Sequence, residues 1–94
     1  MKNLPTFSTY CRNTTAANAL VFDMGNGLLV YFSYKTPVGF SKFGTVTVRQ
    51  NEWGPTTGKH LNAIDNGDKS SRIPGDRFES LLADELAKSA NVPA

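Results

Sequence analysis

Residues 19–35 decide the fold, and they read ALVFDMGNGLLVYFSYK. Two runs rich in β-branched, aromatic and other apolar residues, 19–24 and 28–35, flank the tripeptide Gly25-Asn26-Gly27. Apolar runs separated by a short glycine-rich loop are typical of a β-hairpin. The sequence therefore predicts two antiparallel strands at the centre of the domain.

The length of the hairpin loop decides which side chains share a face. A two-residue loop would place Asp23 among the apolar side chains, whereas a three-residue loop places Met24 opposite Leu28. Burial of a core favours the three-residue loop, with Gly27 in the left-handed conformation. One face of the hairpin then carries Leu20, Phe22, Met24, Leu28, Val30, Phe32 and Tyr34, and the other carries Val21, Asp23, Leu29, Tyr31, Ser33 and Lys35.

The segments on either side of the hairpin predict further strands. Residues 44–50 alternate between polar and apolar, which indicates a strand with Val46 and Val48 inward and Thr45, Thr47 and Arg49 outward. Pro37 cannot donate to a central ladder, so residues 36–40 are expected to leave the strand at an edge, a bulge or a turn. A short strand over residues 7–12 is expected at the N-terminal edge.

Two helices are predicted after the strands. Thr57, Leu61 and Ile64 recur at helical spacing, which indicates a short helix capped by Thr56 or Thr57 and ending near Asn66-Gly67. Pro74 is expected in the first turn of a second helix. Its apolar stripe, which should lie across the apolar sheet face, consists of Phe78, Leu81, Leu82 and Leu86.

These elements predict an α+β domain. An antiparallel sheet of three to four strands carries a C-terminal helix packed on one face, with a short second helix beside it. The chain of 94 residues is expected to form one domain, 1–94. Residues 1–17 form an N-terminal segment with an edge strand, residues 18–50 hold the antiparallel strands, and residues 55–90 hold the two helices.

Composition excludes several classes of protein. The net charge is +2, divided into +4 over residues 1–63 and −2 over residues 64–94, without the dense basic clusters of a dedicated nucleic-acid binder. Cys11 is the only cysteine, so neither an internal disulfide nor a cysteine-based metal site is expected. No segment approaches the roughly 20 apolar residues that span a bilayer, and no signal peptide is evident, which favours the cytoplasm.

Residues 51–60, NEWGPTTGKH, are the most distinctive polar stretch. They resemble a phosphate-binding loop, but three residues rather than four separate the glycines, and His60 stands where a magnesium-binding hydroxyl is needed. His60 near Glu52 as a general base, or with Cys11 as a nucleophile pair, lacks any local signature. No catalytic residue, metal site or cofactor is predicted, and residues 65–68 are interpreted as a turn rather than a calcium loop.

The sequence instead favours a contact surface. Aromatic and basic side chains on an open sheet face and on the adjoining helix could stack bases or join a protein interface. A Thr–Gly–Lys segment at a helix N-terminus could also hold a phosphate or carboxylate from a partner. The predicted binding residues are Tyr31, Lys35, Arg49, Trp53, Thr56, Thr57, Lys59 and His60.

Two motifs carry a resemblance to a family. Residues 31–38, YFSYKTPV, are followed at a distance by residues 51–62, NEWGPTTGKHLN. Together they resemble small uncharacterised proteins of bacteriophages, prophages and their bacterial hosts, over roughly residues 18–86. The resemblance implies a setting, namely a phage-type accessory protein in the bacterial cytoplasm, and it supplies no activity, ligand or catalytic residue.

The function predicted from the sequence is a non-enzymatic binding module that engages a host or phage protein, such as a component of host defence. The alternative is a nucleic-acid-binding module that uses the basic and aromatic sheet face. For the latter, Lys59→Glu with Arg49→Glu is expected to abolish binding without lowering stability. An exposed sheet edge would also permit pairing with a second copy, and the sequence leaves the oligomeric state open.

Overall fold

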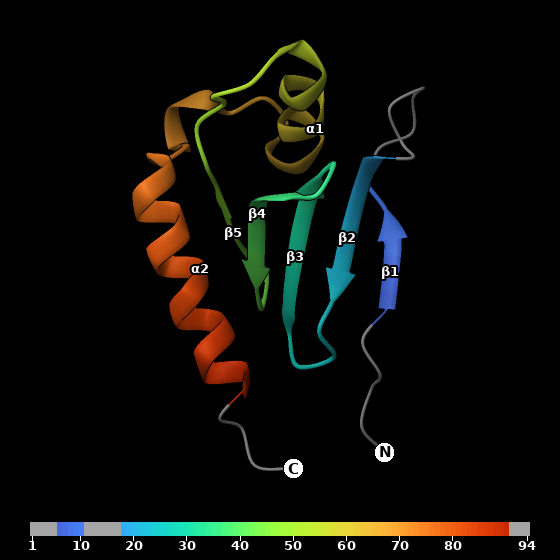
Figure 1. Cartoon of the computed structure of the whole chain (residues 1–94), viewed down its shortest axis with the longest axis vertical. Coiled ribbons are helices and arrows are strands. Elements are labelled where there is room, and N and C mark those ends of the chain that lie inside the picture. Colours follow the sequence, from blue (N-terminus) through green and yellow to red (C-terminus); the bar gives the residue numbers. More distant parts are fainter. Residues whose placement is uncertain (1–5, 11–17, 91–94) are drawn as a thin grey trace.

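A five-stranded antiparallel sheet forms the centre of the protein in the computed structural model, which describes residues 6–10 and 18–90 (Figure 1). The strands follow one another in space as in sequence: β1 (Thr6–Thr9), β2 (Ala19–Asp23), β3 (Leu28–Ser33), β4 (Thr36–Lys42) and β5 (Thr45–Val48). Helix α1 (Pro55–Asp65), a short 3-10 helix η2 (Lys69–Ser71) and helix α2 (Gly75–Ala90) follow. The predicted α+β class is confirmed.

The central hairpin has the predicted register. The Met24 amide donates to the Leu28 carbonyl at 3.0 Å, and Phe22 lies opposite Val30. Gly27 has a φ of 90°, the left-handed conformation expected for the last loop residue. Strand β1 pairs with β2 and forms one edge of the sheet, as predicted, although residues 11–12 of the expected strand lie outside the described residues. Core burial therefore identifies the loop length correctly.

The sheet has more strands than predicted because residues 36–42 form β4. Residues 36–40 were expected to leave the strand, with Pro37 at an edge, a bulge or a turn, but they belong to a strand that lies between β3 and β5. The ladder accepts the proline at a bulge, where Phe32 is opposite Pro37 and Tyr31 is opposite Gly39, so that Val38 is the extra residue. The Val38 carbonyl turns to β5 and accepts the Arg49 amide at 3.1 Å. A bulge was one of the three positions expected for Pro37.

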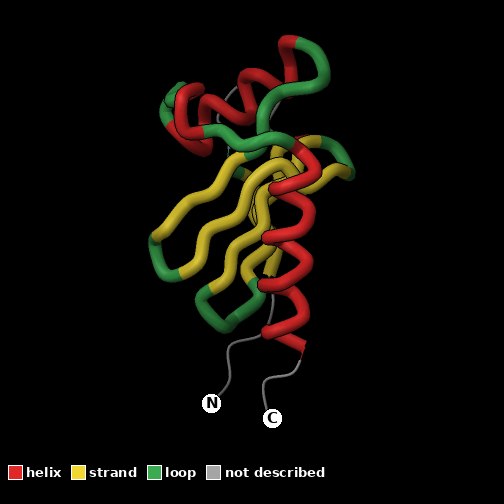
Figure 2. Tube along the Cα trace, turned by 90° about the vertical axis from the view of Figure 1, so that its left-hand side faces the viewer, coloured by secondary structure: helices red, strands yellow, loops and turns green. Residues whose placement is uncertain are grey.

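Two helices cover different parts of the sheet (Figures 1 and 2). Helix α2 packs on the face that carries Val30 and Phe40, and this core comprises Leu28, Val30, Phe40, Phe78 and Leu82. Helix α1 packs against the sheet through a second core. This core comprises Val38, Val48 and Leu61, with Ile64 at its margin. The strand register places Val48 and Phe40 on opposite faces, so the two helices lie on opposite faces of the sheet.

Strand β5 corrects the predicted facing of two residues. Val46 was expected inward, but it is 45% exposed because α1 covers only the Val48 end of that face. Arg49 was expected outward, but it is buried, at 6% exposure. Arg49 follows the last residue of β5, donates its amide to Val38 of β4 and pairs in parallel with residue 73, and its side chain lies beneath α2. Arg49 still alternates with Val48, since Val48 faces α1 and Arg49 faces α2, and it is buried because both faces of the sheet are covered at this end.

Helix α2 follows the predicted stripe. Phe78 and Leu82 are buried, Leu81 is half-buried, and Leu86 is exposed near the C-terminal end. The Phe78 ring lies 5.7 Å from the Phe40 ring, centroid to centroid. In the part of the chain that the structure describes, no helix is both long enough and apolar enough to cross a membrane.

Two glycines allow a matched test of the hairpin loops. Gly27 and Gly44 both have a φ of 90°, but a Cβ at Gly27 would overlap the Phe43 ring, whereas a Cβ at Gly44 meets nothing within 4 Å. We expect Gly44→Ala to cost about 1–2 kcal/mol from backbone strain alone. Gly27→Ala should cost more, because the Phe43 ring must also move away from residue 27. In the Phe43→Ala background, urea denaturation should give Gly27→Ala and Gly44→Ala the same cost. If Gly27→Ala cost as much in the Phe43→Ala background as in the wild type, the packing of the Phe43 ring on Gly27 would be contradicted.

Candidate functional site

Arg49 joins the end of the sheet to α2. Its guanidinium donates to Glu52 at 3.1 Å and to Glu79 at 3.3 Å. The same group lies 4.8 Å from the Trp53 ring centroid and 5.7 Å from that of Phe78. A planar cation held between two rings and two carboxylates is a packing element. The predicted variant Arg49→Glu is therefore wrong as a surface probe, because it would bury a carboxylate between two others.

The corner before α1 is built by Asn51. Its Oδ1 accepts the Trp53 amide at 2.9 Å, and its Nδ2 donates to the Gly54 carbonyl at 3.3 Å. This side-chain turn feeds the helix N-terminus, where Gly54 is the N-cap and Pro55 the first residue. The predicted threonine cap is wrong. Helix α1 begins before the threonines, and its N-cap residue is Gly54, which has no side chain that could cap the helix. The C-terminal end at Asn66, with φ 56°, confirms the expected stop.

Because α1 begins at Pro55, Thr57 points inward and joins a buried polar cluster. Ser33, at the end of β3, lies with its Oγ 3.1 Å from Thr57 Oγ1 and 2.7 Å from His60 Nδ1. None of the three is more than 6% exposed, and His60 is fully buried. The rings of Tyr10 and Tyr34 pack on His60 at 6.2 and 6.0 Å. These contacts fix α1 to the sheet.

A small pocket of about 130 Å³ lies over this cluster. Tyr34 and Trp53, which are 51% and 45% exposed, belong to its wall. Ser33 and Thr57 supply buried hydroxyls, and the wall is completed by Thr36 and Val38. We call these six residues the aromatic pocket. Its walls come from the β3–β4 turn and from the corner before α1, which are far apart in the sequence.

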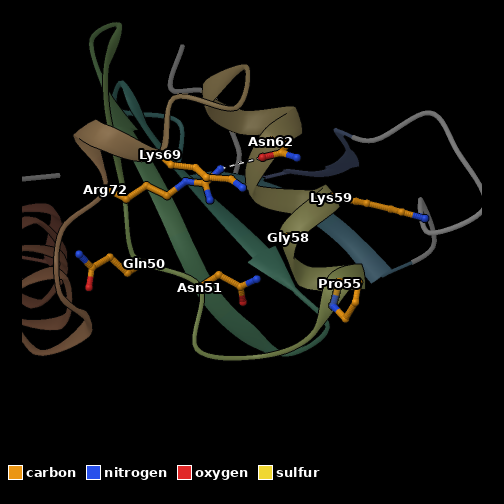
Figure 3. Close-up of a pocket in the computed structure, with 8 residues that line it drawn as sticks. All are labelled: Gln50, Asn51, Pro55, Gly58, Lys59, Asn62, Lys69 and Arg72. Carbon is orange, nitrogen blue, oxygen red and sulfur yellow. Dashed lines mark hydrogen bonds between the residues drawn. The ribbon is translucent and has the colours of Figure 1, made fainter.

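A larger cavity, about 560 Å³, lies on another side of α1 (Figure 3). We call it the basic cavity, and it is lined by Gln50, Asn51, Pro55, Gly58, Lys59, Asn62, Lys69 and Arg72. Arg72 donates from Nε and Nη2 to the Asp65 carboxylate at 2.7 and 3.0 Å, and from Nη2 to Asn62 at 2.9 Å. The hydrogen bond to Asp65 raises the pKa of Arg72, which keeps the guanidinium charged.

The structure distributes the predicted binding residues over several environments. Trp53 and Thr57 line the aromatic pocket, Lys59 lines the basic cavity, and Lys35 is exposed on the β3–β4 turn. Thr56 is half-buried. Tyr31 is half-buried with its ring 5.2 Å from that of Tyr10, and burial raises the pKa of its hydroxyl. Arg49 and His60 are buried, and Cys11 lies outside the described residues.

Of the fourteen residues that line these two cavities, the sequence predicted three as binding residues, namely Trp53, Thr57 and Lys59. Ser33 and Tyr34 were placed on the hairpin faces but not at a site, and Asn62, Lys69 and Arg72 were not singled out. Tyr34 has a φ of 58° in a two-residue turn. This conformation is uncommon for tyrosine, and nothing in the sequence predicts it. Arg72, seven residues after Asp65, carried the one available signal, because an acid and a base so spaced across a polar turn can pair.

Residues 3–80 match the sequence profile of a protein family. The chain belongs to a family of unknown function, DUF8033. The match includes all five strands, α1 and the beginning of α2, and so it contains every residue of the aromatic pocket and of the basic cavity. No curated protein and no solved structure is significantly similar to the chain.

Proposed function

We propose that this protein is a non-enzymatic binding module that recognises a protein partner through the aromatic pocket. The observation that carries the proposal is the pair of exposed aromatic rings, Tyr34 and Trp53, at a pocket with buried hydroxyls. Tyrosine and tryptophan dominate the energetics of protein interfaces, and they do so where they border a pocket that a partner side chain can fill. A volume of about 130 Å³ suits one small side chain of the partner.

The rigidity of the pocket supports this role. Ser33 and Thr57 are held by the hydrogen bonds of the buried cluster. Trp53 is held by its ring contact with Arg49 and by the hydrogen bond that its backbone amide donates to Asn51 Oδ1. A surface that is ordered before binding loses less conformational entropy when a partner arrives. The pocket therefore has the two properties that favour an interface hot spot, namely exposed aromatic area and preorganisation.

The burial of His60 supports the absence of catalysis. The Ser33–His60 contact has the composition of a nucleophile and base, but a general base must come within hydrogen-bond reach of the proton it abstracts. His60 has no exposed surface, so a substrate has no direct approach to the base of this pair. The geometry suits a structural role for this pair.

The proposed setting is that of a small phage-type accessory protein in the cytoplasm of a bacterial host. Its proposed partner is a host or phage protein, for example a component of host defence. The alternative, nucleic-acid binding by the sheet face, has less support in the geometry. Of the basic side chains expected there, Arg49 is enclosed by Glu52, Glu79 and two rings.

Affinity capture from host or infected-cell lysate tests the proposed function. We expect the wild type to recover a partner and Trp53→Ala to weaken its binding by at least about tenfold, as for an interface hot spot. Tyr34→Asn should have a similar effect, since asparagine tolerates the positive φ of that position. Phe43→Ala is the matched control, because Phe43 is 78% exposed on the β4–β5 turn, outside the pocket.

Thermal melts of each variant should precede the capture, because Trp53 also packs on Arg49. Recovery of no partner by the wild type, or equal recovery by folded Trp53→Ala and Tyr34→Asn, would refute the pocket as the interface.

A further inference from the structure

The basic cavity brings together two basic side chains that have no carboxylate partner among the described residues, whereas the other two such side chains, Lys35 and Arg77, lie elsewhere. Among the described residues, Lys42, Arg49, Arg72 and Lys88 form ion pairs with carboxylates. Lys59 and Lys69 form none within the same ranges, and both line the cavity. No acidic residue is among those that line it. Positive charges gathered around a concave surface raise the local potential and attract an anion.

Arg72 makes this cavity a built site. Its guanidinium is fixed by Asp65 through Nε and Nη2, and only 4% of the side-chain surface is exposed. Nη1 makes no hydrogen bond to any described residue. The guanidinium extends between Asn62 of α1 and the Gln50–Asn51 segment (Figure 3). A preorganised guanidinium with donors left over suits a phosphate oxygen.

The other lining groups suit a ligand larger than a lone phosphate. Asn62 uses its Oδ1 to hold Arg72, which leaves its amide nitrogen as a donor, and Gln50 makes no side-chain hydrogen bond to a described residue. Lys59 stands at the rim and extends away from Arg72 in Figure 3, and its flexible stem lets the ammonium turn toward a bound anion. A volume of about 560 Å³ lies within the range of about 300–1,000 Å³ for small-molecule sites.

We infer that the basic cavity binds a small ligand with two linked phosphates, of the size and charge of a nucleoside diphosphate. The negative charges of a diphosphate are matched by Lys59 and Lys69. Arg72, whose charge is paired with Asp65, contributes a hydrogen-bond donor, and the side-chain amides of Gln50 and Asn62 can bind the other polar groups of the ligand. The cavity is lined by α1, by the Gln50–Asn51 segment and by the Lys69–Arg72 segment, and its volume suits a compact ligand. This inference is independent of the aromatic pocket and of a protein partner.

Calorimetric titration of the intact protein tests the inference, with ADP, pyrophosphate and adenosine as probes. We expect saturable binding of ADP and pyrophosphate that weakens with added salt, and adenosine at least about tenfold weaker than ADP because the charge-assisted hydrogen bonds are absent. The double variant Lys59→Gln, Lys69→Gln should weaken ADP binding by at least about tenfold. Arg72 is left intact, since its pairing with Asp65 also holds the fold.

The matched control is Arg77→Gln, Lys88→Gln, which removes the same charge from exposed positions of α2 and should leave ADP affinity within about twofold. Equal loss in both double variants would assign binding to net charge and overturn the site. Absence of ADP and pyrophosphate binding at millimolar concentration would also overturn it, as would adenosine binding as tightly as ADP. A ten-nucleotide thymidine strand binding the cavity more tightly than ADP would reassign it to a nucleic-acid backbone.

Discussion

Leu82→Asp should prevent stable folding. Leu82 is 6% exposed in the core between α2 and the sheet, together with Leu28, Val30, Phe40 and Phe78. The substitution removes a buried aliphatic side chain, which costs about 2–5 kcal/mol, and places in the core a carboxyl group that has no partner there. A domain of this size has about 5–10 kcal/mol of stability in all, so the cost approaches the whole of it.

Circular dichroism melts measure this effect, and Leu86 offers the control. Leu86 lies on the same stripe one turn further on but is 39% exposed, so Leu86→Asp should cost only about 1 kcal/mol. A cooperative melt of Leu82→Asp near the wild-type midpoint would show that α2 does not pack on the sheet. Equal losses at both positions would show that the stripe is buried to its end.

The hairpin and α2 could be predicted because their signals are local. The loop Gly25–Gly27 fixes the register through the next few residues on either side, and the stripe from Phe78 to Leu86 repeats within one helix. Strand β4 was missed because Pro37 argues against a central strand. The sheet accommodates Pro37 through a bulge in the pairing of β4 with β3. This bulge depends on the residues of both strands, so it cannot be predicted from the sequence of β4 alone.

The candidate sites could be predicted only in part. Residues 51–60 contain the predicted corner between β5 and α1, and Trp53, Thr57 and Lys59 line the two cavities. The partners come from elsewhere: Ser33 and Tyr34 from the β3–β4 turn, and Arg72 from the segment that pairs with the exit of β5. Proximity across such sequence distances follows from the sheet order and from the parallel pairing at residue 73, and neither leaves a periodic signal in the sequence.

Arg49→Ala should lower the free energy of unfolding by about 2–4 kcal/mol. The arginine stem and guanidinium fill the space between Trp53 and Phe78, and truncation leaves that space empty. The lost ion pairs contribute less, because Glu52 and Glu79 are 56% and 70% exposed and regain water. One contribution acts in the opposite direction. Arg49 Nε is buried and has no hydrogen-bond partner among the described residues, so its removal relieves that cost.

Two variants separate packing from charge at this position. Arg49→Met keeps most of the aliphatic stem and should recover about half of the loss, whereas Arg77→Ala, which removes an exposed arginine of α2, should change stability by less than about 0.5 kcal/mol.

Gly75→Ala tests the same contact from α2, because a Cβ there would overlap Arg49 Nη2 and lie 2.8 Å from Cζ. In urea denaturation it should destabilise the wild type but stabilise Arg49→Ala, where the space is free and alanine favours the helix. If Gly75→Ala had the same effect in both backgrounds, the guanidinium would not occupy the position against α2, and the coupling between the sheet exit and that helix would have to be carried by the backbone pairing at residue 73 alone.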